Sequence, residues 1–296
     1  NQKTIVSTDM LIEGVHFDLS YFPLKHLGYK AVVSSISDIC AMFGITKQIT
    51  VSIAVSNRFK LESIQELYSG IKLACQRYSI DLIGGDTTSS QKGLIISVTA
   101  IGCPTQLGYV TRSGSKTNDL LVVTGSLGAA YLGLQILERE KQVFLVNPEN
   151  KPDLSNYKYL VERQLKPEAK SDVIDFLLMN KIKPTSMIDI SDGLSSELIH
   201  LCKKSGRGCI VYEDKLPISE EAISTCKEFK LDPTVISLSG GEDYELLFTL
   251  DSKHLETIEK HREFSVIGYM TKDKEPNLLT KDGKTTKISS LGWKSF

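Results

Sequence analysis

The first third of the chain alternates between strand-like and helix-like runs of apolar positions. Short apolar or alternating runs predict four strands, at residues 3–10, 48–55, 80–86 and 93–103. Apolar residues at helical spacing predict two helices between them, at residues 23–44 and 60–79. The third strand is expected to end in a turn at Gly84 and Gly85.

The rest of the chain continues the alternation of strands and helices. Strands are expected at residues 119–125, 185–190, 208–213, 244–250 and 264–270. Helices are expected at residues 126–140, 157–180, 193–205, 219–237 and 252–262. This order predicts an α+β or α/β protein, and two domains are the preferred interpretation. Turn-forming residues at 104–118 suggest a boundary, with domains at 1–107 and 108–296.

The composition removes several function classes. The chain has 296 residues, and 35 Lys and Arg against 36 Asp and Glu give a net charge of −1, which argues against a nucleic-acid partner. No apolar run approaches the roughly 20 residues of a membrane helix, and no signal peptide is visible. The six cysteines form no CxxC pair, so reduced core thiols in a cytoplasmic protein are expected.

Five aspartates stand in apolar or small-residue surroundings, four near the ends of predicted elements and one, Asp38, inside a predicted helix. These are Asp9, Asp38, Asp86, Asp189 and Asp192. An isolated buried carboxylate is costly, so such groups are paired, hydrogen-bonded or bound to metal. Few Lys or Arg residues lie beside them in the sequence. Oxygen ligands without His or Cys favour Mg²⁺, with Mn²⁺ as a substitute.

Each aspartate also has an ordinary structural interpretation. Asp192 could cap the helix that follows, Asp86 could form a turn, and Asp9 could lie in a surface turn. Asp38 is harder to explain in this way, because an Asp inside an apolar helix is unfavourable. The spacing of the five residues by itself leaves both interpretations open.

Other motifs give little support to competing chemistries. The segment GSKT at 114–117 resembles a phosphate-binding loop, but Ser115 breaks the Gly-Lys adjacency that such a loop needs. No GxGxxG motif follows a strand, so a nicotinamide cofactor is unsupported, and there is no GxSxG nucleophile elbow.

Seven segments, in order along the chain, resemble the thiamine-monophosphate kinase family. They read STDMLIEGVHF, SDICAM, LIGGDTT, TRSGSKTND, MIDISDGL, SGGEDYELLFT and GWKSF. That family belongs to a superfamily shared with aminoimidazole ribonucleotide synthetase, selenophosphate synthetase and the hydrogenase-maturation dehydratase. The segments DMLIEGVHF and SGGEDYEL resemble the kinase specifically, whereas GGDT and DISDGL are typical of the wider superfamily.

The resemblance implies a fold, a reaction and a set of ligands. The N-terminal part would be a mixed-sheet α+β domain that binds ATP and Mg²⁺ and forms a homodimer through its sheet. The C-terminal part would be an α/β domain of the aminoimidazole ribonucleotide synthetase type that completes the substrate site. The reaction would be ATP-dependent phosphorylation of thiamine monophosphate to thiamine diphosphate, by direct in-line transfer with several Mg²⁺ ions.

The resemblance also implies roles for individual residues. The implied metal ligands are Ser7, Thr8, Asp9, Asp38, Asp86, Asp189 and Asp192, of which Asp38, Asp86 and Asp189 would be catalytic. ATP would contact Gly85, Asp86, Arg112 and Ser191, and the substrate would contact His16, Glu242 and Trp293. Glu242 could instead lie in a solvated turn, and Trp293 could instead fill a core.

The sequence departs from the family pattern at Phe43, Ser115 and Asn118, and the family's upstream glycine-rich segment with paired Asp residues is not in it. Two other functions are therefore considered. One is another ATP-dependent synthetase of the superfamily, and the other is a protein that binds nucleotide or thiamine phosphate without catalysis. Phosphate transfer with the alternative substrates, or tight binding without transfer, would distinguish them.

Overall fold

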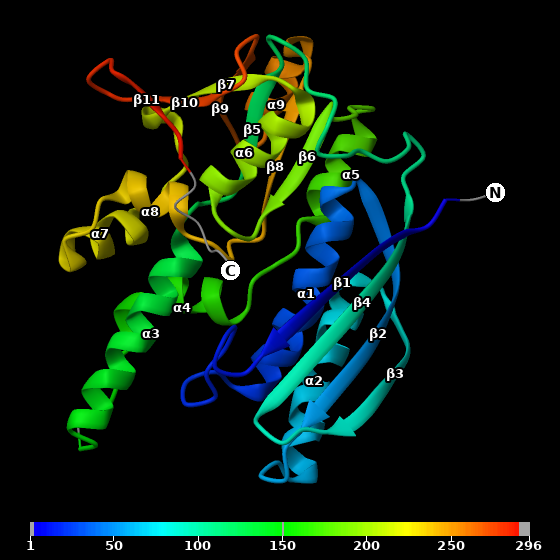
Figure 1. Cartoon of the computed structure of the whole chain (residues 1–296), viewed down its shortest axis with the longest axis vertical. Coiled ribbons are helices and arrows are strands. Elements are labelled where there is room, and N and C mark those ends of the chain that lie inside the picture. Colours follow the sequence, from blue (N-terminus) through cyan, green and yellow to red (C-terminus); the bar gives the residue numbers. More distant parts are fainter. Residues whose placement is uncertain (1–2, 150, 290–296) are drawn as a thin grey trace.

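A computed structural model of the chain describes residues 3–149 and 151–289, which fold around two separate sheets (Figure 1). The first sheet has the strand order β1-β4-β2-β3. Its strands are β1 (Ile5–Ile12), β2 (Gly44–Val55), β3 (Asp81–Ser89) and β4 (Leu94–Pro104). Strand β4 runs antiparallel to both β1 and β2, and β3 runs parallel to β2.

Two helices cover one face of this sheet. Helix α1 (Leu24–Ala41) packs against β1, β2 and β4, and α2 (Leu61–Tyr78) packs against α1. The two helices approach so closely that a methyl group on Gly28 would lie 2.1 Å from the carbonyl oxygen of Leu67. Side chains alternate between buried and partly exposed along β4, as a half-covered sheet requires.

The expected turn at Gly84 and Gly85 is wrong. Both glycines lie inside β3, which continues to Ser89 and pairs along its length with β2. A methyl group on Gly85 would lie 1.9 Å from the carbonyl oxygen of Val51, so the glycine permits a close approach of two backbones.

The second sheet has the strand order β11-β10-β7-β9-β5-β8-β6. Its strands are β5 (Leu120–Thr124), β6 (Ser186–Ile190), β7 (Gly208–Tyr212), β8 (Glu245–Leu250), β9 (Phe264–Thr271), β10 (Pro276–Leu279) and β11 (Thr285–Lys287). Only β10 and β7 pair in parallel, and the other neighbours are antiparallel. The expected α+β and α/β class is confirmed, with sheets of mixed orientation.

The remaining helices follow the first sheet along the chain. They are α3 (Ala129–Val146), α4 (Lys158–Leu165), α5 (Ser171–Met179), α6 (Leu194–Ser205), α7 (Glu220–Phe229), α8 (Pro233–Ser239) and α9 (Leu255–Glu259), with short 3-10 turns η1 (Ser155–Tyr157), η2 (Glu213–Lys215) and η3 (Ser252–His254). Helix α3 projects away from the sheets at its C-terminal end (Figure 1). Strands β10 and β11 were not predicted from the sequence.

Several smaller expectations concern the core and the termini of elements. All six cysteines are free thiols, and five of them are buried, as the sequence predicted. Phe43 is fully buried and ends α1 with a φ of 55°. Asn118 has a φ of 69°, a left-handed conformation that Asn adopts more readily than most residues. Within the described ranges, no helix combines the length and the apolarity needed to span a membrane.

Candidate active site

A cavity of about 890 Å³ lies where β1 and α1 meet the second half of the chain. Its walls come from segments that are far apart in the sequence: the end of β1 with the loop after it, α1, α3, the turn after β6, and the loop before β8. Seven residues expected from the sequence line it: Asp9, His16, Asp38, Asp189, Ser191, Asp192 and Glu242. The fold therefore brings four of the five candidate aspartates to one cavity.

A second cavity of about 800 Å³ lies beside the N-terminal end of β1. Three expected residues line it, Ser7, Asp38 and Arg112, and so do two further cations, Lys3 and Lys204. Asp38 lines this cavity as well as the first one. One carboxylate thus lies between an acidic cavity and a cavity with positively charged walls.

Serine hydroxyls hold the aspartates in place. Three pairs are formed: Ser35 with Asp9 (2.8 Å), Ser37 with Asp189 (2.7 Å) and Ser7 with Asp38. In each pair the hydroxyl donates to the carboxylate. Because the partners are neutral, the hydrogen bonds orient the aspartates without neutralising their charge.

Burial and mutual repulsion raise the pKa values of these acids. Burial, followed by the charge of Asp38, raises the pKa of Asp9 to about 6. The same two causes, in the same order, raise the pKa of Asp189. Burial also raises the pKa of Asp192, although the charges of His200 and Arg112 oppose the change. The cavity therefore favours the arrival of positive charge.

The donor atoms of these residues are chemically compatible with Mg²⁺. Within residues 3–149 and 151–289, no three His, Cys, Asp or Glu side chains are grouped so that they could hold a metal by themselves. Mg²⁺, however, is usually bound through one or two carboxylates together with water and substrate phosphates. Spaced carboxylates and hydroxyls are hard oxygen donors of the required kind.

Some expected residues lie elsewhere. The alternation of β1 puts Thr8 on the open face of the sheet, where its hydroxyl bonds that of Thr99 at 2.9 Å. Gly85 and Asp86 are exposed on β3, which is separated from β1 by two strands, or about 14 Å at roughly 4.8 Å per strand. The structure does not bring these three residues to either cavity, and their implied roles stay predictions. Trp293 lies outside the described residues.

Glu242 is fixed in the first cavity by two residues that the sequence did not single out. Its Oε1 forms an ion pair with the Lys30 ammonium at 3.0 Å, and its Oε2 accepts a hydrogen bond from Gln164 Nε2 at 2.8 Å. Lys30 comes from α1 and is only 1% exposed. A lysine in the middle of the apolar run GYKAVV was the available sequence signal, since a buried ammonium requires a partner.

The loop that carries Glu242 has an unusual backbone. Glu242 and Tyr244 have positive φ angles of 65° and 52°. The backbone N–H of Glu242 donates to the Ser191 carbonyl at 2.7 Å, and that of Tyr244 donates to the Ile190 carbonyl at 2.9 Å. A methyl group on Gly241 would lie 2.5 Å from the Ser191 oxygen. The loop therefore lies directly against the turn that carries Asp192.

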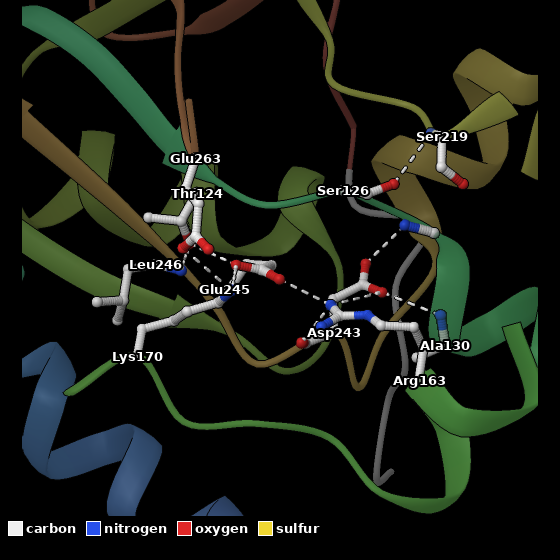
Figure 2. Close-up of polar contacts among 11 residues, drawn as sticks. Thr124, Ser126, Ala130, Arg163, Lys170, Ser219, Asp243, Glu245, Leu246 and Glu263 are labelled. Carbon is white, nitrogen blue, oxygen red and sulfur yellow. Dashed lines mark hydrogen bonds and ion pairs between the residues drawn. The ribbon is translucent and has the colours of Figure 1, made fainter. Parts of the chain in front are cut away.

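A buried ionic network holds this loop from behind (Figure 2). Asp243 is fully buried, and its two oxygens accept the backbone N–H groups of Gly128 (2.6 Å) and Ala130 (3.1 Å) at the start of α3. Arg163 donates to the Asp243 carbonyl at 2.9 Å and to Glu245 Oε1 at 2.8 Å. A negative charge at a helix N-terminus is stabilised by the helix dipole and by the free N–H groups.

The network also extends toward the second sheet. Glu245 Oε2 forms an ion pair with Lys170 at 3.0 Å and accepts a hydrogen bond from the Thr124 hydroxyl at 2.5 Å. Figure 2 shows Arg163 between Asp243 and Glu245, so one cation serves both buried acids. The three acids of the segment GGEDYE therefore have different roles: Glu242 lines the cavity, and Asp243 and Glu245 belong to the buried network.

Glu197 supports the opposite side of the cavity. Its side chain is buried on α6, and Oε1 accepts the backbone N–H groups of Asp192 at 2.9 Å and Ser191 at 3.3 Å. Burial raises the pKa of Glu197 to about 7. An acid at a buried position of the predicted helix was the sequence signal for this contact.

Comparisons with known proteins first define the class. The family described as AIR synthase related protein, N-terminal domain, matches residues 1–103. The family described as AIR synthase related protein, C-terminal domain, matches residues 116–281. The fold is thus that of the AIR synthase related proteins.

More specific relatives share almost the whole chain. The chain is 33% identical to the thiamine-monophosphate kinase of Aquifex aeolicus, covering 100% of the chain and 89% of that relative. It is also 33% identical to the Bacillus subtilis thiamine-monophosphate kinase, covering 97% of the chain and 86% of the relative. A solved structure, AaThiL complexed with AMPPCP and TMP, matches with a TM-score of 0.86 and 30% identity, over 100% of this chain and 88% of that one. The chain belongs to the thiamine-monophosphate kinase family.

Proposed function

We propose that this protein transfers the γ-phosphoryl group of ATP to thiamine monophosphate and releases ADP and thiamine diphosphate. Membership of the kinase family supports the reaction, and a relative binds AMPPCP and TMP together. The observation that carries the assignment to particular residues is that Asp38 lines two adjoining cavities of unlike charge.

The two cavities suit the two substrates. The cavity with Lys3, Arg112 and Lys204 would take the nucleotide, because guanidinium and ammonium groups bind phosphate oxygens. The larger cavity would take thiamine monophosphate, with His16 and Glu242 near its organic part. The phosphate groups of both substrates would then meet near Asp38.

The chemistry demands control of charge more than a strong base. The attacking group is a phosphate oxygen that is already anionic. Two unit charges about 4 Å apart interact by roughly 4 kcal/mol at an effective dielectric of about 20, so two polyanions repel strongly. Mg²⁺, when bound, neutralises phosphate charge and stabilises the transferring group. Asp9, Asp38, Asp189 and Asp192 are the residues that would hold such ions.

The rest of the arrangement serves to position the substrates. Arg112 would bind nucleotide phosphate from one side, and the turn at Ser191 and Asp192, fixed by Glu197, would lie at the other. With one substrate in each cavity, the attacking oxygen of thiamine monophosphate and the leaving oxygen of ADP would lie on opposite sides of the γ-phosphorus, as direct in-line transfer requires. Ser7, Thr8, Gly85, Asp86 and Trp293 remain predicted ligands on the basis of family resemblance.

A homodimer through the first sheet belongs to the same proposal. Strand β3 is exposed along nearly its whole length, and Val6 and Met10 of β1 are 55% and 53% exposed on the face that the helices leave open. Long exposed edges and apolar faces are commonly covered by another chain. A second subunit on this face would also bury β3, which carries Asp86. The free thiols suit a cytoplasmic location.

Release of ADP tests the proposal. The wild-type protein should release ADP only when thiamine monophosphate and Mg²⁺ are both present, and thiamine diphosphate should form in equal amount. Asp38→Asn should lower kcat by about 100-fold or more without lowering the melting temperature, because it removes a charge that faces both phosphates. Asp175→Asn, on the exposed side of α5, is the matched control and should keep full activity. Near-normal turnover by Asp38→Asn would contradict the assignment.

A further inference from the structure

We propose that Gln164 is a specificity-determining residue, whose amide oxygen accepts an N–H from the organic part of the substrate. The inference rests on the proposed function. It assigns recognition of the substrate's organic part to the corner of the larger cavity where Gln164, Glu242 and Lys30 meet. The substrate class is a phosphate ester with an amine-bearing ring. Thiamine monophosphate has such a group in the exocyclic amine of its pyrimidine.

The orientation of the Gln164 amide follows from its neighbour. Gln164 lies on α4, lines the larger cavity and is 2% exposed. Its Nε2 donates to Glu242 Oε2 at 2.8 Å, and a carboxylate can only accept, so the amide nitrogen must face Glu242. The amide oxygen is thereby turned away from Glu242 and is left to accept from another group.

That oxygen has no partner in the protein as described. Among residues 3–149 and 151–289, nothing donates a hydrogen bond to Gln164 Oε1, although the atom is buried. Leaving a buried acceptor unsatisfied is costly, and buried polar groups without a partner are uncommon. An acceptor held in this state beside a cavity is suited to a donor that a ligand supplies.

The Lys30 ammonium is a nearby buried donor, but it does not donate to the Gln164 amide oxygen. The Lys30 ammonium is buried next to Gln164, but it donates to the Gln164 backbone oxygen at 3.1 Å and pairs with Glu242 at 3.0 Å. Its contact with the Phe22 ring, 5.5 Å from the centroid, occupies another side. Lys30 therefore fixes the acceptors of this corner without satisfying the Gln164 amide oxygen.

The corner consequently presents acceptors to a ligand. Glu242 is 28% exposed and keeps a carboxylate at the cavity, and Gln164 adds a neutral amide oxygen nearby. A ring with an N–H donor gains a hydrogen bond here. A phosphate ester of similar shape without that donor leaves the amide oxygen unsatisfied and binds less tightly.

The experiment combines one substitution with one substrate analogue. The probes are thiamine monophosphate and its 4′-deamino analogue, in which hydrogen replaces the exocyclic amine. The full chain and its Gln164→Met variant are compared, because Met keeps a similar length without an acceptor oxygen. Both kcat/KM, from ADP release, and Kd, from calorimetry in the absence of ATP, are measured for each combination.

The wild-type protein should prefer thiamine monophosphate to the deamino analogue by about 10-fold to 100-fold in both quantities. Gln164→Met should bind thiamine monophosphate about as weakly as the analogue and should discriminate less than about 3-fold. Gln76→Met, an exposed site on α2, is the matched control and should discriminate like the wild type.

Two results overturn the inference: a wild-type protein that does not distinguish the two ligands, or a Gln164→Met variant that discriminates as strongly as the wild type. A variant that binds both ligands more weakly, with the wild-type ratio of affinities, would show only a general loss of structure. That result counts against the inference. Absence of ADP release in the wild type would refute the proposed function instead. The calorimetric ratios would still decide the role of Gln164.

Discussion

Replacing Asp9 with Asn should stabilise the metal-free protein, and the gain should grow with pH. Asp9 is largely buried beside Asp38, and these two causes raise its pKa from 3.8 to about 6. Asn keeps the shape and can still accept the hydrogen bond from Ser35, but it carries no charge. The substitution therefore removes mainly the cost of holding an anion in the cavity.

The magnitude follows from the difference in the pKa of Asp9 between the folded and unfolded states. Between pH 3.8 and about 6 the folded protein holds a proton on Asp9 that the unfolded chain has lost, so the free energy of unfolding falls as pH rises. At about 1.4 kcal/mol per pH unit, the full effect is about 3 kcal/mol, reached above pH 7. It vanishes below the unfolded pKa.

Urea unfolding followed by circular dichroism measures the effect. Wild type and Asp9→Asn are unfolded in EDTA at pH 4.5 and at pH 7.5, and the difference in their free energies of unfolding is compared. That difference should widen by about 2 kcal/mol between the two pH values, since part of the full effect is already present at pH 4.5. Excess Mg²⁺ at pH 7.5 should stabilise the wild type more than the variant, because the bound ion requires the carboxylate.

A difference that stays constant between pH 4.5 and pH 7.5 would refute this reasoning, because it would mean that Asp9 titrates alike in both states. Asp214→Asn, an exposed carboxylate outside both cavities, provides the matched control. If Mg²⁺ stabilises the wild type and Asp9→Asn equally, Asp9 does not bind the ion. The predicted pH dependence of stability would be unaffected by that result.

Two further predictions concern stability. Gly28→Ala should lower the melting temperature and cost about 1–3 kcal/mol, because its methyl group would meet the Leu67 carbonyl at 2.1 Å; Gly84→Ala, whose nearest contact is 3.9 Å, should cost much less. Asp243→Ala should lower the free energy of unfolding, measured in urea, by about 3–5 kcal/mol. The substitution removes the acceptor of two backbone N–H groups at the start of α3 and one of the buried acids beside Arg163. A loss below about 1 kcal/mol would show that the network is dispensable.

The elements were predictable where their cause is local. The spacing of apolar residues predicted α1 and α2, and an apolar run predicted β4, because burial leaves a local pattern of apolar residues in each of these elements. Strands β10 and β11 were missed because they are short, and β10 pairs with β7, far away in the chain. Nothing in their own residues signals that distant partner.

Glycine in β3 illustrates how a correct local rule gives a wrong prediction. Adjacent glycines usually mark a turn, and Gly84 with Gly85 was interpreted in that way. Gly85 is required because a Cβ at this position would lie 1.9 Å from the Val51 carbonyl oxygen and would clash with it. Only the pairing of β3 with β2 creates that requirement, so the sequence of β3 alone could not reveal it.

Some residues of the site could likewise be recognised from the sequence, and others only from the fold. Aspartates in apolar surroundings were recognisable because burying a charge without a partner is costly, and four of the five line one cavity. Asp86 fits the same chemical criterion, yet the fold of one chain leaves it exposed on β3. Gln164 carries no signal in its own segment, since an amide acquires a role only from the groups that surround it.

The sequence by itself determined which side chains this protein has for its chemistry, how its helices and most strands alternate, and which family it resembles, because these depend on residue types and short spacings. The tertiary structure alone decided that Asp38 lies between two cavities and that Lys30, Gln164 and Glu242 meet at one corner. Distances between groups more than a hundred residues apart are set by how helices and sheets pack, and packing depends on all of their surfaces at once.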